Sequence, residues 1–188
     1  MNRKVIVVLL LSLLFGWVQA AELAGVKLDD RIQLKGDTTP LLLNGLGIRE
    51  KFFFNIYVAG LYLPSKSKSS AEILAMAGSK RIAMHFLYKE VGKDKLVEGW
   101  NEGFEYNQSA ARLDQLKDRL KTFNTMFETV HKGDVILLDF VPGSGTRVIL
   151  NGVEKGRVGG DDFNQALLAV WLGKKPADKD LKEGMLGL

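Results

Sequence analysis

The sequence of 188 residues has no cysteine and only two histidines. The absence of cysteine excludes disulfides, thiol redox chemistry and thiolate metal sites. His85 lies in an apolar segment beside Met84 and Phe86, and it is far from His131, so the two do not have the spacing of metal ligands. We therefore expect no metal and no cofactor.

The net charge of the chain is also small. The chain carries 26 Lys and Arg against 22 Asp and Glu, a formal net charge of +4. Two of the positive charges, Arg3 and Lys4, lie in the first 20 residues, which we expect to be removed by cleavage, as argued below. The balance that remains argues against nucleic acid or an anionic membrane as a partner.

Long hydrophobic runs are absent after the first 20 residues. There, Arg3 and Lys4 precede the apolar run Val5–Phe15, and Val18 and Ala20 stand before the expected cleavage point. This pattern is typical of a secretory signal peptide with cleavage after Ala20. The run is too short to span a hydrocarbon core of about 30 Å, so we expect no integral membrane segment in the mature chain. We expect residues 21–188 to form one soluble domain in the periplasm.

The common catalytic motifs are missing. Pro142-Gly143-Ser144-Gly145 lacks the Gly-x-Ser-x-Gly spacing of a nucleophile elbow and is typical of a turn between strands. Gly45-Leu46-Gly47 lacks the third glycine of a dinucleotide-binding loop. Local motifs therefore indicate no familiar enzyme class.

The hydrophobic patterning predicts an α+β fold. Alternation and β-branched or aromatic runs predict strands, and spacings of three and four predict helices. The predicted strands are 23–28, 31–35, 52–63, 81–88, 135–141, 146–150 and 153–158, and the predicted helices are 71–77, 92–107, 113–130 and 163–172. Because βαβ alternation is absent, we expect an antiparallel sheet covered by helices on one face.

Three local features sharpen this prediction. Asn44-Gly45 is a strong turn dipeptide that should end the preceding apolar run. An apolar stripe over 113–130 predicts one amphipathic helix. Asp161 is a suitable N-cap for the last helix, which should stop at Gly173.

Several short motifs, in this order, resemble the chalcone isomerase-like proteins, specifically their exported bacterial branch. The resemblance covers nearly all of the mature chain, and the order and spacing of the motifs carry its specificity. The motifs are Asn44-Gly45-x-Gly47-x-Arg49, Asn55-x-Tyr57-Val58-Ala59-Gly60-Leu61-Tyr62-Leu63, Gly133-Asp134, Pro142-Gly143-x-Gly145-Thr146, Asn151-Gly152-x-x-x-Gly156, Asp162-Phe163 and Trp171-Leu172-Gly173.

This resemblance implies an open-faced β-sandwich, in which a large antiparallel sheet and a helical layer enclose a ligand cleft. In plant chalcone isomerases an arginine, two threonines, a tyrosine and an asparagine steer an intramolecular ring closure. Arg49 matches the arginine, whereas Tyr57 and Val170 stand at the two threonine positions. The helical tyrosine and asparagine have no clear match around Lys95–Asn101.

These departures point away from the plant reaction, because ring closure needs a full hydrogen-bond network. The pair Arg49 and Tyr57 instead resembles the fatty-acid-binding members of the superfamily, and the implied ligand is a small hydrophobic carboxylate or a polyphenol-like molecule. The alternative function is an isomerase acting on a chalcone-like or other enone substrate through Arg49. A third possibility is a structural protein in which Arg49 is paired with an acidic neighbour and Tyr57 is core.

Geometry sets a condition on the shared site. Eight residues of straight strand would separate Arg49 and Tyr57 by about 26 Å. The chain must therefore reverse between them, near Glu50-Lys51, so that the two face each other on paired strands. The apolar candidates for the cleft are Phe53, Met84, Phe86, Phe104, Phe123 and Leu168.

Overall fold

The computed structural model describes residues 20–188, so the expected signal peptide lies outside the described residues except for Ala20. The strands are β1 (Ala20–Leu23), β2 (Val26–Asp29), β3 (Arg31–Gln33), β4 (Pro40–Lys51), β5 (Phe54–Leu63), β6 (Lys80–Phe86), β7 (Glu90–Val91), β8 (Val130–His131), β9 (Val135–Val141), β10 (Gly145–Leu150) and β11 (Val153–Val158). The helices are α1 (Ser70–Ala75), α2 (Lys93–Asn107), α3 (Ala110–Asn124), α4 (Asp161–Leu172) and α5 (Lys179–Leu186).

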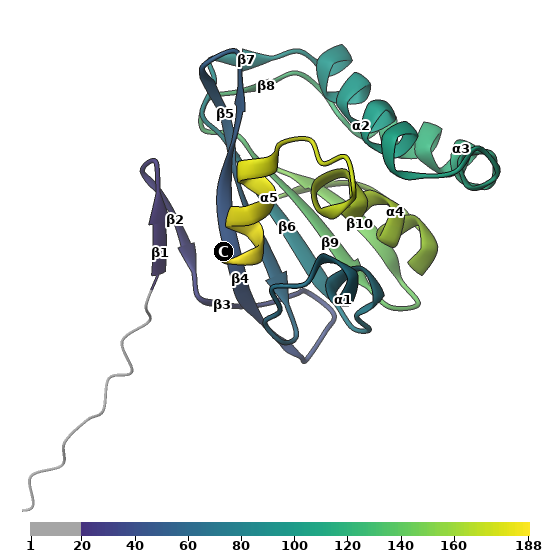
Figure 1. Cartoon of the computed structure of the whole chain (residues 1–188), viewed down its shortest axis with the longest axis horizontal. Coiled ribbons are helices and arrows are strands. Elements are labelled where there is room, and N and C mark those ends of the chain that lie inside the picture. Colours follow the sequence, from purple (N-terminus) through teal and green to yellow (C-terminus); the bar gives the residue numbers. More distant parts are fainter. Residues whose placement is uncertain (1–19) are drawn as a thin grey trace, which may run out of the picture.

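Seven strands form one antiparallel sheet in the order β11-β10-β9-β6-β5-β4-β3 (Figure 1). Two short pairs, β1 with β2 and β7 with β8, lie outside it. The α+β fold with a large antiparallel sheet and helices on one face is therefore confirmed. Within residues 20–188, no helix is long and apolar enough to cross a membrane.

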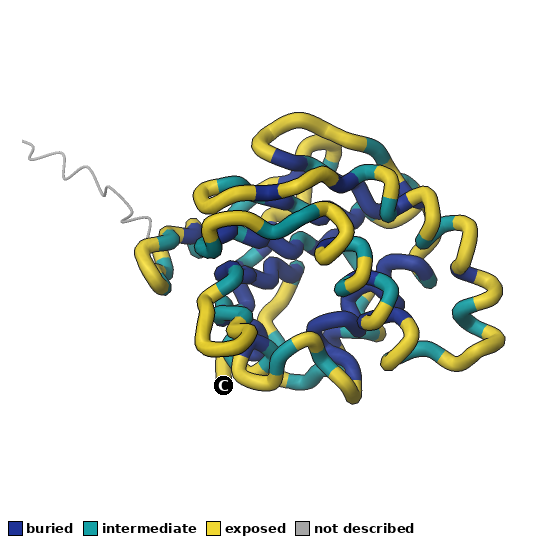
Figure 2. Tube along the Cα trace, turned by 90° about the horizontal axis from the view of Figure 1, so that it is seen from above, coloured by how far each residue is buried: buried dark blue, intermediate teal, exposed yellow. Residues whose placement is uncertain are grey.

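The main hydrophobic core lies between the sheet and the helices. It joins inward residues of β5 and β6 to α2, α4 and α5, and its fully buried aromatic side chains include Trp171, Phe104, Phe123 and Phe163. A smaller cluster on the other face includes Leu28, Leu41 and Leu43. Figure 2 shows the buried segments gathered inside a rim of exposed turns. The helix-covered face therefore supplies most of the apolar burial.

A β-bulge at Asn44 corrects one prediction. Asn44-Gly45 does not turn the chain but lies inside β4, where the pairing with β5 shifts between Leu43 and Gly45. The Asn44 side chain is buried and donates to the Met185 carbonyl at 2.8 Å, while its oxygen accepts from Ser67 N at 2.8 Å. These tertiary hydrogen bonds stabilise a bulge where the local sequence favours a turn.

The bulge also changes which residues of β4 face the helices. Leu41 and Leu43 belong to the cluster on the open face, and strict alternation would place Gly45, Gly47 and Arg49 there too. One extra residue reverses the alternation. Gly45 and Gly47 consequently lie against α5, and Arg49 lies under α2.

The helix α5 was not predicted from the sequence. It packs against β4 through close backbone contacts (Figure 1). A Cβ added at Gly45 would lie 2.2 Å from the Gly184 carbonyl oxygen, and one at Gly47 would lie 2.9 Å from that of Leu181. These positions need glycine because the neighbours are backbone atoms that cannot move aside.

Three further boundaries differ from the predictions. The stripe over 113–130 is not one helix: α3 ends at Asn124, and Phe127 and Val130 reach the core from a loop and from β8. The hydrophobic periodicity correctly predicted that Phe127 and Val130 are buried, but not that they lie outside the helix. The predicted strand 23–28 is split by a turn at Ala24-Gly25, since both residues have positive φ. The N-cap of α4 is Gly160, and Asp161 is the first helical residue.

Candidate functional site

The β4–β5 hairpin places Arg49 and Tyr57 directly opposite each other. The two are register partners in the antiparallel ladder, and the chain reverses at Phe52-Phe53. The predicted strand 52–63 therefore starts at Phe54, and the reversal lies just after the expected Glu50-Lys51. The guanidinium carbon of Arg49 lies 5.8 Å from the centroid of the Tyr57 ring. The reversal that a shared site requires is thus present.

Arg49 has no acidic partner among residues 20–188. None of the ion pairs in this part of the chain includes it, and its Nε is buried without a hydrogen-bond acceptor. The Asp178 carboxylate is engaged elsewhere, since it accepts from Glu50 N at 3.1 Å and from Leu181 N at 2.9 Å. A buried donor without an acceptor is costly, so this guanidinium is suited to a ligand that brings one.

Tyr57 is buried beneath this cation. Its hydroxyl oxygen accepts a hydrogen bond from Trp171 Nε1 at 3.1 Å, and its ring packs edge-on against Phe86 at 5.5 Å. Burial raises the pKa of Tyr57, and the charge of Arg49 offsets only part of that effect. The phenol therefore stays protonated at neutral pH. Because its oxygen is used as an acceptor, its own hydrogen can be donated to a ligand.

Both side chains line one small cavity between the sheet and α2. Its volume is about 30 Å³, which is enough for a water molecule. The lining residues are Arg49, Ile56, Tyr57, Met84, Phe86, Val91, Lys95, Leu96, Gly99, Trp100, Val170 and Ala177. The wall is mostly apolar, and the polar side chains Arg49, Tyr57, Lys95 and Trp100 contribute to it from two sides.

The predicted cleft residues separate into three groups. Met84 and Phe86 line the cavity. Phe104, Phe123 and Leu168 are buried core residues that do not line it. Phe53 was wrongly placed, because it lies at the tip of the hairpin with its side chain in solvent.

Sequence reasoning missed the contribution of α2. Leu96 and Trp100 are one helical turn apart, and both line the cavity. The Nε1 of Trp100 is a second buried donor without an acceptor in the described part of the chain. The i, i+4 spacing of Leu96, Trp100 and Phe104 was the available signal, but the periodicity of this helix is weak.

The cavity does not reproduce the catalytic set of plant chalcone isomerases. The cavity-facing residues of α2 are Lys95, Leu96, Gly99 and Trp100, with no tyrosine or asparagine among them. Asn101 is held by Asn124, whose amide donates to it at 2.8 Å. Val170, at the second threonine position, adds only an apolar contact.

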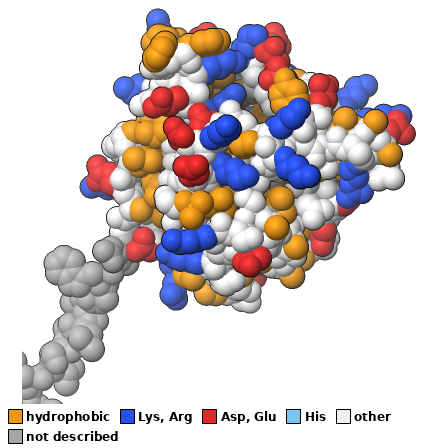
Figure 3. Space-filling view, viewed as in Figure 1, with side chains coloured by type: hydrophobic (Ala, Val, Ile, Leu, Met, Phe, Trp, Pro, Cys, Tyr) orange, Lys and Arg blue, Asp and Glu red, His pale blue; other side chains and the backbone are white. Residues whose placement is uncertain are grey.

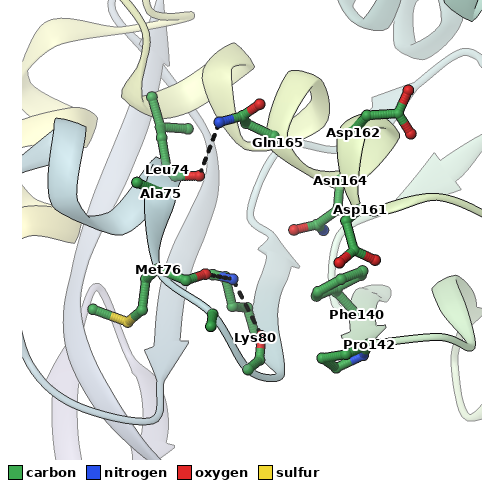
Figure 4. A pocket seen from close by; sticks show the side chains of 12 residues that line it. Leu74, Ala75, Met76, Lys80, Phe140, Pro142, Asp161, Asp162, Asn164 and Gln165 are labelled. Atoms are coloured by element: carbon green, nitrogen blue, oxygen red, sulfur yellow. Dashed lines mark hydrogen bonds between the residues drawn. The ribbon is translucent and has the colours of Figure 1, made fainter.

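A larger hollow of about 400 Å³ lies between α1 and the start of α4 (Figure 4). Its buried cation is Lys80, whose ammonium donates to the Met76 carbonyl at 2.5 Å and to the Gly78 carbonyl at 3.2 Å. Burial lowers the pKa of Lys80. Since these carbonyls already satisfy the ammonium, this hollow lacks the unpaired buried donor that marks the Arg49 cavity. No group of three or more His, Asp or Glu side chains in residues 20–188 is placed to hold a metal ion.

Comparison with known proteins gives a family match and matches to solved structures. Residues 20–187 match a family model described as chalcone isomerase-like. The crystal structure of a fatty-acid binding protein from Arabidopsis thaliana aligns with a TM-score of 0.66 and 17% sequence identity, covering 89% of this chain and 96% of that chain. No curated protein sequence matches. At this identity the structural match shows a shared fold.

Proposed function

Because the chain belongs to the chalcone isomerase-like family, we propose that it is a non-catalytic binder of a small hydrophobic carboxylate, such as a fatty acid. Arg49 and Tyr57 anchor the carboxylate in this proposal. The fold is shared with a protein described as a fatty-acid binding protein, which supports the ligand class.

The observation that carries the proposal is the buried Nε of Arg49, which has no acceptor in the described chain, next to the hydroxyl group of Tyr57. A carboxylate offers two acceptor oxygens, so it can accept from the guanidinium and from the phenol at the same time. Met84, Phe86, Leu96 and Val170 then provide apolar surface for the alkyl part.

The cavity volume sets a condition on binding. About 30 Å³ accommodates a water or the head of a carboxylate but not an alkyl chain. In this proposal α2 moves away from β5 and β6 when the ligand enters, because Leu96 and Trp100 close the cavity from that side.

Tryptophan fluorescence tests the proposal directly. The chain has three tryptophans, of which Trp17 lies in the expected signal peptide, Trp100 lines the cavity and Trp171 bonds to Tyr57. Titration with palmitate should change the emission and reach saturation. Arg49→Met should weaken binding by at least about tenfold, because each hydrogen bond to a charged group contributes about 1.5–3 kcal/mol.

Arg31→Met is the matched control, since Arg31 is an exposed arginine of β3 outside the cavity, and its titration should follow that of the unchanged protein. Lipid extraction and mass spectrometry of protein purified from cells should also release a fatty acid. A protein that is empty after extraction and that gives no saturable response to palmitate would contradict the proposal.

Isomerase activity is the other function considered, and the loss of the threonine positions to Tyr57 and Val170 weighs against it. Purified protein should convert a chalcone no faster than buffer does. Turnover that disappears in Arg49→Ala would establish the isomerase instead.

We also propose that the protein belongs to the exported bacterial branch of the family and acts in the periplasm. The support is the pattern of residues 1–20, with a basic start, an apolar run and Ala20 before the cleavage point. Cell fractionation and N-terminal sequencing should find a periplasmic protein that begins at Ala21. A cytoplasmic protein that retains Met1 would contradict it.

A further inference from the structure

Three consecutive phenylalanines form an exposed tip at the β4–β5 hairpin. Phe52 is 79% exposed, Phe53 102% and Phe54 55%, and they are three of the six large hydrophobic side chains exposed in residues 20–188. The other three, Tyr106, Val153 and Leu188, are scattered. Figure 3 shows hydrophobic side chains gathered at the end of the molecule above β5, with Lys or Arg side chains beside them. We name Phe52, Phe53 and Phe54 the aromatic tip.

Folding alone does not explain these residues. Phe52 and Phe53 occupy the two central positions of the hairpin turn with φ of 50° and 69°. Turns with two positive φ values favour Asn-Gly, and bulky side chains are disfavoured there. The two phenylalanines therefore strain the turn while burying almost nothing.

Charged side chains lie next to the aromatic tip. The ammonium of Lys51 lies 5.9 Å from the centroid of the Phe52 ring. Phe54 packs against Tyr88 at 5.3 Å. Lys89 follows Tyr88 in the chain, and its carbonyl accepts from Lys132 N at 3.2 Å. Carboxylates are also near. Glu50 and Glu90 adjoin Lys51 and Lys89 in the sequence, and Glu90 lies 3.2 Å from His131. The pKa of Glu98 is lowered by its hydrogen bond with Lys95 and also by the charge of Lys51. Exposed aromatic rings with a lysine ammonium beside them are typical of a membrane-interface anchor.

We propose that the aromatic tip inserts into the interfacial region of a phospholipid bilayer that contains anionic headgroups. The rings bury their apolar surface at the acyl boundary, and Lys51, Lys89 and Lys132 contact headgroup phosphates. Insertion by a turn leaves the β4–β5 ladder intact, because only the two turn residues and Phe54 need to enter the lipid.

If the proposed function holds, the position of the tip relates membrane contact to ligand binding. Arg49 is three residues from Phe52 along a strand, which corresponds to roughly 10 Å. A docked tip therefore holds the cavity close to the lipid surface, where a fatty acid can pass between bilayer and protein. Vesicle binding itself does not depend on the cavity, so Arg49→Met should bind vesicles like the unchanged protein.

Co-sedimentation with vesicles tests the inference. The full protein as purified from cells, with its N-terminus determined by mass spectrometry, is mixed with phosphatidylglycerol–phosphatidylcholine vesicles or with pure phosphatidylcholine vesicles. We expect binding to the mixed vesicles that weakens with added salt, and weaker binding to the neutral ones. The double substitution Phe52→Asn, Phe53→Gly should reduce binding by at least about tenfold.

Two controls keep the result interpretable. The double variant places the preferred residues in the turn, so its unfolding temperature should equal or exceed that of the unchanged protein, and weaker binding cannot then reflect misfolding. Tyr106→Ser removes another exposed aromatic, whose ring lies 5.7 Å from the Lys175 ammonium, and it should leave binding unchanged.

Equal sedimentation of the double variant and the unchanged protein would overturn the inference. A concentration-dependent dimer in solution that the double variant abolishes, without vesicle binding by either, would also overturn it and assign the tip to contact between two copies.

Discussion

Two cations, Arg49 and Lys80, show how the function of a residue depends on its partners. Lys80 donates to two backbone carbonyls and ties the segment after α1 to the start of β6. Arg49 has a buried Nε with no acceptor in the described chain. Satisfied polar groups stabilise a fold, whereas an unsatisfied one indicates a place for a ligand.

Tyr57 serves both fold and site, because its hydroxyl accepts the buried N–H of Trp171. Tyr57→Phe should lower the free energy of unfolding by about 1–3 kcal/mol, since Trp171 Nε1 is left without an acceptor. Chemical denaturation measures this change. In the Trp171→Phe background the same substitution should cost much less, and equal costs in both backgrounds would show that this hydrogen bond does not stabilise the protein.

At the scale of elements, the contact of α5 with β4 is made by backbone. Gly45→Ala should destabilise the protein by several kcal/mol or detach α5, because the new methyl group meets the Gly184 carbonyl. Hydrogen exchange of Leu181, Met185 and Leu186 amides should accelerate. Gly159→Ala is the control, since nothing lies within 4 Å of its added Cβ, and exchange in α5 as slow in Gly45→Ala as in this control would refute the prediction.

Strands β6, β9 and β10 are joined by a buried charge cluster. Asp139 is fully buried and accepts from Arg81 at 2.5 and 2.8 Å and from Arg147 at 2.9 Å, on adjacent positions of the three strands. Asp139→Asn should cost about 3–5 kcal/mol, because two arginines lose their counter-charge. Urea denaturation checks this, with the exposed Asp114→Asn expected to change stability by less than about 1 kcal/mol. A loss no larger than that of the control would contradict the prediction.

For the whole molecule, the stability depends on pH through groups whose pKa is lower in the folded than in the unfolded chain. Burial lowers the pKa of His85, and hydrogen bonds from Arg119 lower the pKa of Asp162 to about 2. In both cases the unfolded chain binds the proton first as the pH falls. Stability should therefore decrease below about pH 6.5 because of His85, and again between about pH 4 and 2 because of Asp162.

Urea denaturation from pH 2 to 8 measures both steps. In Asp162→Asn the lower step should shrink by about 1 kcal/mol, a value reduced for the partial exposure of this carboxylate. In His85→Gln the upper step should shrink. Profiles of the variants parallel to that of the unchanged protein would contradict the assignments.

Charge also has to be considered for the whole molecule. The nearly balanced composition argued against an anionic membrane partner, yet composition averages over the surface. The fold exposes three consecutive phenylalanines, with Lys51 against Phe52 and with Tyr88, which precedes Lys89, against Phe54. A partner contacts one patch, so the local arrangement decides this question.

The sequence by itself determined the α+β class, most strands and helices, and the pair Arg49 and Tyr57, because these follow from local periodicity and from the order of short motifs. Only the tertiary structure decided that Asn44 forms a bulge rather than a turn, that α5 covers β4, and that Trp100 helps to close the cavity. The physical reason is that each depends on groups distant in sequence: Met185 and Ser67 stabilise the bulge, and the bulge turns Arg49 toward the helices.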